Sequence, residues 1–267
     1  LTFNNITLNI TGNITVESGT YFNANNPKFT IQTNDNTSGM KISSSTGVVI
    51  NNSRFTTNET SNTYSWIYVD GNNVTFDNFY FNYLGTSAVD SNVAGLGFKQ
   101  VTSGLVRSAT YGVNNTNGVE LVGSSNVVVE YCSDDTDSDT IFKVLFGDTS
   151  QNNTIRHNLD VYSINFQGQN TAEQTGNLIY NNTIHYNILL TDLDNGYFSY
   201  ENILWNNNFS NGALEDENSS LYNTMVYNNS FGEIKWNSTN LTFGSAGSAP
   251  TLALGDNLYI ENNLVGV

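Results

Sequence analysis

Short apolar runs alternate with polar residues along most of the chain. Runs of three to four β-branched, aliphatic or aromatic residues stand between Asn, Gly, Ser or Asp, as at 127–129, 178–180 and 258–260. Such runs are typical of short strands bounded by turns. No window carries an apolar stripe at helical spacing. The pattern therefore predicts an all-β protein with little or no helix.

One phrase recurs within this pattern: an Asn, three mostly apolar residues, a variable residue and then Asn again. Its first Asn falls at Asn73, Asn153, Asn177, Asn202, Asn223 and Asn257. With weaker copies that begin at Gly47, Gly104 and Asn126, neighbouring phrases lie 21 to 34 residues apart, the spacing of repeat architectures. A unit this short cannot bury a core alone, so successive units must stack on one another.

The repeat predicts a right-handed parallel β-helix of about ten coils, each with about three short strands. We expect it to form a single domain over residues 1–267, with the clearest repeats at 46–267. The long steps after Asn73 and Asn223 predict loop insertions at 84–98 and 232–254. Recognition is expected at such loops rather than on the coils.

Asn is the natural corner residue of such a coil because it tolerates the left-handed backbone conformation. Its amide carries donors and an acceptor, so amides that recur at one corner can hydrogen-bond along the stack. We therefore expect a structural ladder formed by Asn73, Asn153, Asn177, Asn202, Asn223 and Asn257.

The chain is strongly acidic, with 8 basic and 24 acidic residues and a formal net charge of −16. This charge disfavours nucleic acid, anionic polysaccharides and anionic membranes as partners, and it attracts divalent cations and basic partners. The sequence contains no apolar run long enough to span a membrane.

Several Asn-x-Ser/Thr triplets predict an extracellular, glycosylated surface. The candidate glycosylation sites outside the ladder are Asn36, Asn58, Asn114, Asn218 and Asn237. The chain begins at Leu1 rather than Met, which we interpret as a mature or trimmed product whose signal peptide or anchor lies outside this sequence.

An acidic run follows the apolar residues at 127–129. Within it, Asp135, Asp137 and Asp139 alternate along an extended segment, so their carboxylates can point to one side and bind Ca²⁺. The alternative is a solvated acidic loop, since the Gly and Glu of an EF-type loop are absent. No other cofactor is required.

The remaining reactive side chains predict no catalytic set. His157 and His185 lie about one coil apart and could share a metal, but no third ligand is evident and surface or ladder positions suffice to explain them. Cys132 is the sole cysteine, so it forms no internal disulfide. We expect it to be a small buried apolar residue.

Phrases such as GNLIYNNTI, ENILWNNNF and DNLYIENNL resemble the parallel β-helix repeats of the pectate-lyase-like superfamily. The resemblance is strongest to the NosD-like and adhesin-like surface proteins of archaea and bacteria. It implies the fold but leaves function open, because this scaffold carries lyases, hydrolases, epimerases, tailspikes and adhesins. The polygalacturonase-like Gly-His-Gly and Arg-x-Lys segments are absent from this chain.

We expect a non-catalytic extracellular structural protein of the cell envelope, either self-assembling into a filament, sheath or surface layer, or adhesin-like. The expected partners are other copies end to end, other envelope proteins or a glycan. The alternative is a Ca²⁺-dependent polysaccharide lyase or hydrolase. In that case Asp134 and Asp135 would supply paired carboxylates, and Lys143 and Arg156 are the nearest basic residues.

Overall fold

The computed structural model of the chain describes most of the first 209 residues and shorter stretches beyond them. The described ranges are 2–19, 21–32, 38–43, 47–57, 64–85, 95–112, 115, 118–135, 143–147, 149–167, 173–192, 198–209, 213–216, 220–222, 224–231, 233–236, 242–243, 258–261 and 264–265. Within these ranges the regular structure is entirely β. The prediction of an all-β parallel β-helix is confirmed.

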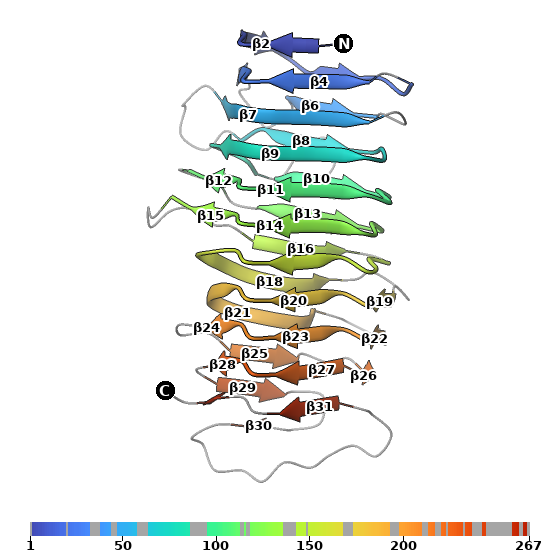
Figure 1. Cartoon of the computed structure of the whole chain (residues 1–267), viewed down its shortest axis with the longest axis vertical. Helices are drawn as coiled ribbons and strands as arrows, with labels where there is room; N and C mark the ends of the chain where they lie inside the picture. The colour runs from blue at the N-terminus through green and yellow to red at the C-terminus, as the bar shows by residue number, and fades with distance from the viewer. Residues whose placement is uncertain are drawn as a thin grey trace.

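Two long parallel sheets run the length of the rod (Figure 1). The first sheet contains, in order, β1 (Thr2–Asn4), β4 (Phe22–Asn25), β7 (Val48–Thr57), β9 (Val74–Phe81), β11 (Gly104–Arg107), β14 (Val127–Glu130), β17 (Thr154–Arg156), β20 (Leu178–Tyr180), β23 (Ile203–Trp205), β27 (Thr224–Tyr227) and β31 (Leu258–Glu261). The second contains β3 (Ile14–Val16), β6 (Gly39–Ile42), β8 (Trp66–Val69), β10 (Leu96–Lys99), β13 (Val119–Val122), β16 (Lys143–Gly147), β18 (Val161–Gln167), β21 (Thr183–Asp192), β24 (Asn208–Phe209), β28 (Ser230–Phe231) and β32 (Leu264–Val265).

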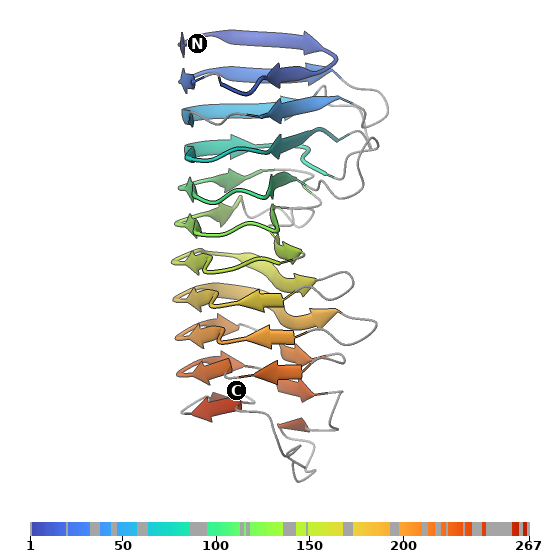
Figure 2. The same cartoon turned by 90° about the vertical axis from the view of Figure 1, so that its right-hand side faces the viewer.

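Further strands complete the coils. They are β2 (Thr7–Thr11), β5 (Lys28–Gln32), β12 (Thr110–Tyr111), β15 (Ser133–Asp134), β19 (Glu173–Thr175), β22 (Phe198–Tyr200), β25 (Ala213–Asp216), β26 (Ser220–Tyr222), β29 (Glu233–Trp236) and β30 (Thr242–Phe243). Both predicted loop insertions contain strand residues: β10 begins inside 84–98, and β29 pairs antiparallel with β30 inside 232–254. Figure 2 shows each coil stacked directly on the one above.

Apolar side chains from both sheets fill the interior of the rod. Val74, Val106, Val127 and Ile155 are among those that are essentially inaccessible to solvent. Aromatic rings also stack from coil to coil, as between Phe146 and Phe166, whose centroids lie 4.5 Å apart. Because a single coil exposes its apolar residues at its upper and lower edges, this continuous core exists only in the stack.

In ten successive coils, one corner uses the left-handed conformation. The corner residue follows the first-sheet strand in eight of these coils and lies within β7 and β9 in the other two. Its φ angle is between 52° and 55°, at Asn5, Asn26, Asn52, Asn78, Ser108, Tyr131, His157, Asn181, Asn206 and Asn228. We call this set the corner column. Seven of these ten residues are Asn, which tolerates this conformation better than most side chains. Outward-facing amides hydrogen-bond along it, as from Asn206 Nδ2 to Asn181 Oδ1 at 2.6 Å.

In four successive coils, the residue that follows the corner column is an Asn that turns inward, and these four Asn residues form a buried ladder. The Nδ2 groups of Asn158, Asn182 and Asn207 donate to the Oδ1 atoms of Asn182, Asn207 and Asn229 at 2.9, 3.0 and 2.9 Å. Each of these Asn side chains also donates to a main-chain carbonyl of the preceding coil. In the coils above, Cys132, Ala109 and Phe79 occupy the corresponding position.

A second buried ladder contains three of the six Asn residues singled out from the sequence. Asn153 donates to Asn177 at 3.1 Å, and Asn177 donates to Asn202 at 3.0 Å. Asn73 differs, because it lies one residue before the strand residue that occupies this column. It is exposed, with a φ angle of 56°, and its carbonyl accepts a hydrogen bond from the N–H of Val48. Asn223 and Asn257 lie outside the described residues.

Candidate functional site

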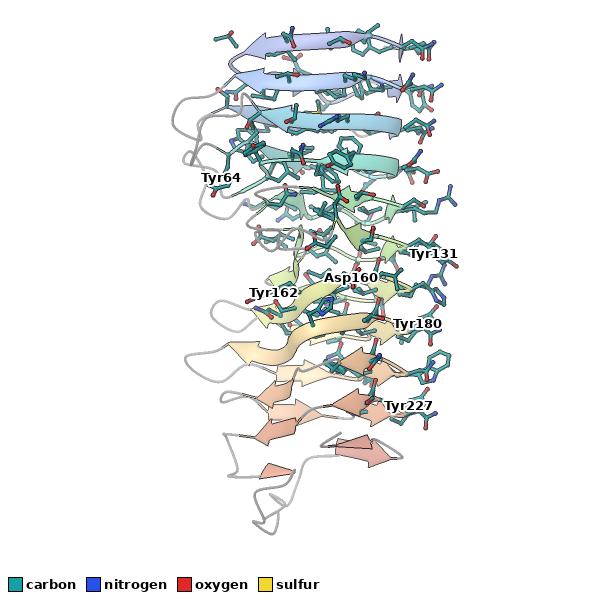
Figure 3. The ribbon with its side chains drawn as sticks, turned by 90° about the vertical axis from the view of Figure 1, so that its left-hand side faces the viewer. Tyr64, Tyr131, Asp160, Tyr162, Tyr180 and Tyr227 are labelled. Atoms are coloured by element: carbon teal, nitrogen blue, oxygen red, sulfur yellow. The ribbon has the colours of Figure 1, made fainter. Side chains whose placement is uncertain are left out.

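Titratable side chains from neighbouring coils meet on the face that follows the corner column. Asp134 ends strand β15, Asp160 lies one coil further along the rod, and His185 belongs to β21 in the next coil. His185 Nε2 lies 2.8 Å from Asp160 Oδ1. In Figure 3, Asp160 lies on this face beside the edge that carries Tyr131 and Tyr180.

Asp134 is the most perturbed carboxyl of this cluster. Burial raises its pKa to about 6, and the negative charges of Asp160 and Asp135 act in the same direction. Its Oδ1 atom is buried and has no hydrogen-bond partner among the described residues. A carboxyl in such an environment takes up a proton more readily than an ordinary aspartate.

Asp135 is exposed and faces a tyrosine from an earlier coil. The hydroxyl of Tyr80 donates to Asp135 Oδ2 at 3.1 Å, and the guanidinium of Arg54 lies over the Tyr80 ring at 4.9 Å. Burial and the bond to Asp135 raise the pKa of Tyr80. Asp135, one of the three residues predicted to bind Ca²⁺, is therefore hydrogen-bonded to a tyrosine. The other two, Asp137 and Asp139, lie outside the described residues.

Over the part of the chain that the structure describes, no three His, Cys, Asp or Glu side chains are grouped closely enough to hold a metal ion. The two histidines have different partners. His185 pairs with Asp160, whereas His157 stands in the corner column, where its ring stacks on Tyr131 at 5.2 Å with an interplanar angle of 7°. Nothing in this arrangement joins them in one site.

A strip of charged and aromatic side chains runs beside the corner column. Arg107 pairs with Asp77 at 2.5 Å, and Arg156 pairs with Glu130 at 2.6 Å. The pair with Arg107 lowers the pKa of Asp77, mainly through the hydrogen bond. Arg156 also donates to the hydroxyl of Tyr180 at 2.9 Å. Arg156 is therefore engaged with Glu130 and Tyr180 rather than placed as a base beside the acidic run.

Aromatic rings continue this strip toward the C-terminal coils. Tyr180 stacks on Trp205 at 4.9 Å, and Trp205 stacks on Tyr227 at 6.1 Å. His157 meets the edge of Tyr180 at 5.6 Å and so links this stack to Tyr131. Figure 3 shows Tyr131, Tyr180 and Tyr227 projecting from the same edge of the rod.

Sequence reasoning alone did not single out Tyr80, Tyr131 or Asp160. Tyr131 and His157 had a detectable signal, since they stand where the repeated phrase has the first Asn of its pair. Asp160 and Tyr80 had none, because their importance comes from neighbours in other coils. The candidate glycosylation sites Asn36, Asn58, Asn114, Asn218 and Asn237 all lie outside the described residues.

Cys132 is buried, as expected for a small apolar residue. Its burial raises the pKa of the thiol to about 12. In the ranges for which the structure gives positions, no helix is long and apolar enough to cross a membrane.

The chain matches no protein-family model and no curated protein sequence. Among solved structures it is similar to the periplasmic alginate epimerase AlgG, with 11% identity and a TM-score of 0.42 over 91% of this chain and 76% of the epimerase. It is also similar to the Dettilon tailspike protein, with 13% identity and a TM-score of 0.32 over 97% of this chain and 61% of the tailspike. At these levels no function is transferred to this chain.

Proposed function

We propose that this chain is a non-catalytic extracellular rod of the cell envelope with an adhesin-like role. The observation that supports the proposal is the way its coils are joined. Both long sheets continue from coil to coil in parallel register, and buried amide ladders tie the coils from Asn153 to Asn229. A stack joined in this way is stiff and extended, so it can hold a surface at a fixed distance from its attachment point.

Surface labelling of intact cells of the source organism tests the location. An antibody raised against the folded chain should label cells before permeabilisation, and protease added outside should remove the signal. Labelling that requires permeabilisation would refute an extracellular role. Self-assembly is tested separately by light scattering over a concentration series. A particle length that does not change with concentration would refute self-assembly. Such a result is compatible with the adhesin-like role.

A polysaccharide hydrolase is the second candidate, and Asp134 is the observation that favours it. A carboxyl with a pKa of about 6 can donate a proton to a glycosidic oxygen, and Asp160 is the neighbouring carboxyl that would serve as the base for water. A reducing-sugar assay on a polysaccharide panel, with and without Ca²⁺, tests this candidate. Activity that disappears in Asp134→Asn but persists in Asp70→Asn would replace the non-catalytic proposal. Asp70 serves as a control because it follows β8, on the second sheet.

A further inference from the structure

Two aromatic residues interrupt the Asn-rich corner column at adjacent coils. Tyr131 and His157 both have a φ angle of 55°, a conformation that bulky side chains rarely adopt. Every other member of the column is Asn or Ser. Residues held in sparsely populated conformations gather at functional sites more often than elsewhere. We therefore expect the side chains of Tyr131 and His157 to have a role that offsets the cost of this backbone conformation.

Two exposed apolar side chains lie in the coils of these rings, where His157 itself is half-buried. Tyr131 is 57% exposed, and Leu159, two residues after His157, is 58% exposed. We call Tyr131, His157 and Leu159 the corner patch. Only one other large apolar side chain among the described residues, Tyr21, is comparably exposed, at 49%. Two of the three most exposed apolar side chains thus lie in two adjacent coils.

The geometry leaves one face of the Tyr131 ring open. His157 stacks against one face. On the other side, the corner position of the preceding coil carries Ser108, whose side chain is too small to cover a ring. An open, pre-positioned aromatic face is a good platform for a flat partner, because its own conformational freedom is already restricted.

Charges beside the patch favour an uncharged partner. Arg156 precedes His157 and pairs with Glu130, which precedes Tyr131. Arg107, in the coil above, pairs with Asp77. These pairs cancel the charge beside the rings, and the chain as a whole carries a charge of −16 and repels anions. A neutral ligand meets no such repulsion.

Polar groups at the edge of the patch can bind hydroxyl groups. Asp160 directly follows Leu159, and Asp134 lies one coil above it. Oδ1 of Asp134 is buried and Oδ1 of Asp160 pairs with His185, which leaves the Oδ2 atoms to accept hydrogen bonds from a ligand beside the apolar surface. A ligand that suits this arrangement has an apolar face for the ring and hydroxyl groups along its rim. A pyranose sugar has both, because its C–H groups lie on one face and its hydroxyl groups point outward.

We propose that the corner patch is a binding site for a neutral glycan, with one pyranose ring stacked on the open face of Tyr131. This inference rests on the proposed adhesin-like function and specifies the ligand class and the site. The stacked ring lies against Tyr131 on the side of Ser108, and neighbouring sugar residues extend toward Leu159 and the carboxylates of Asp134 and Asp160.

Calorimetric titration of the whole chain with a panel of oligosaccharides tests the proposal. The panel contains neutral gluco-, manno-, galacto- and xylo-hexaoses, an oligogalacturonate and a basic peptide. We expect at least one neutral hexaose to bind and Tyr131→Asn to weaken that binding by about tenfold or more. Asn suits the corner conformation, so this variant should keep its fold, which circular dichroism and thermal melting will check.

Two further variants control the interpretation. Tyr131→Phe keeps the ring and should keep most of the affinity. Tyr21→Asn removes an exposed ring elsewhere on the rod and should leave the affinity unchanged. Binding of a neutral hexaose that is equal in Tyr131→Asn and in the unaltered chain would overturn the site. Binding of the anionic oligomer or basic peptide alone, or of nothing, would overturn the ligand class. Neither result affects the surface-labelling test of the proposed function.

Discussion

The two adjacent asparagines Asn181 and Asn182 should differ sharply in their contribution to stability. Asn182 is 2% exposed, and its side chain makes five hydrogen bonds. Asn181 lies in the corner column and accepts one bond, from Asn206. The sequence presents the pair as equivalent, so comparing the two isolates the effect of tertiary position.

Asn182→Ala removes the acceptor of two donors on Asn158, its backbone N–H and its Nδ2 group. It also removes the donor to the carbonyl of Ile155. A buried polar group left without its partner costs about 1–3 kcal/mol. With partial relaxation around the smaller side chain, we expect a loss of about 3–5 kcal/mol in the free energy of unfolding, which is at the high end for a single substitution.

Asn181→Gly is the matched control. Glycine adopts the left-handed conformation without strain, so this variant loses only an exposed hydrogen bond and should remain within about 1 kcal/mol of the unaltered chain. Urea denaturation followed by circular dichroism gives both values. A loss below about 1 kcal/mol for Asn182→Ala would refute the conclusion that the buried ladder joins the coils.

Three further predictions follow from the same structure. Because the folded pKa of Asp134 is about 6 and its ordinary value is 3.8, the folded state binds more protons between these values, so this carboxyl should lower stability as pH rises from about 4 to 6. We discount the effect to about 1 kcal/mol because the side chain is only half-buried. The midpoints of urea denaturation, measured at several pH values, should differ between the unaltered chain and Asp134→Asn only above pH 4. Cys132 should not react with a thiol reagent at pH 8 until the chain unfolds, since its thiol is buried with a pKa of about 12; rapid labelling of the native chain would contradict this. Gly39→Ala should destabilise the chain by about 1–3 kcal/mol, because a methyl group there would overlap the ring and carbonyl of Trp66, and an unchanged melting temperature would show that the coils adjust freely.

Local regularities made the architecture predictable. Short runs of β-forming residues between polar corners recur along the chain at a spacing of 21 to 34 residues, so the sequence indicates a parallel solenoid without knowledge of the contacts between coils. The role of Asn was also predictable in kind, because its preference for the left-handed conformation is a property of the residue itself.

The sequence alone did not predict which column of stacked side chains an individual residue joins. Asn73 and Asn153 begin the same phrase, yet Asn73 is exposed and Asn153 is buried in a ladder. The difference comes from the pairing between coils, where Val127 rather than Asn126 aligns with Asn153. Coils differ in length, so sequence spacing cannot specify which residue of one coil lies above which residue of the next.

The sequence by itself determined a stacked, all-β, acidic rod with Asn at most of its corners, because the strand and corner residues recur along the chain and the charge follows from composition alone. Only the tertiary structure decided which Asn of each pair faces inward, and which side chains meet outside. Asp134, Asp160 and His185 come from three coils, and the rings of Tyr131 and His157 stack across two. Contacts between coils depend on register, and register is set by packing across the whole core rather than by any local segment.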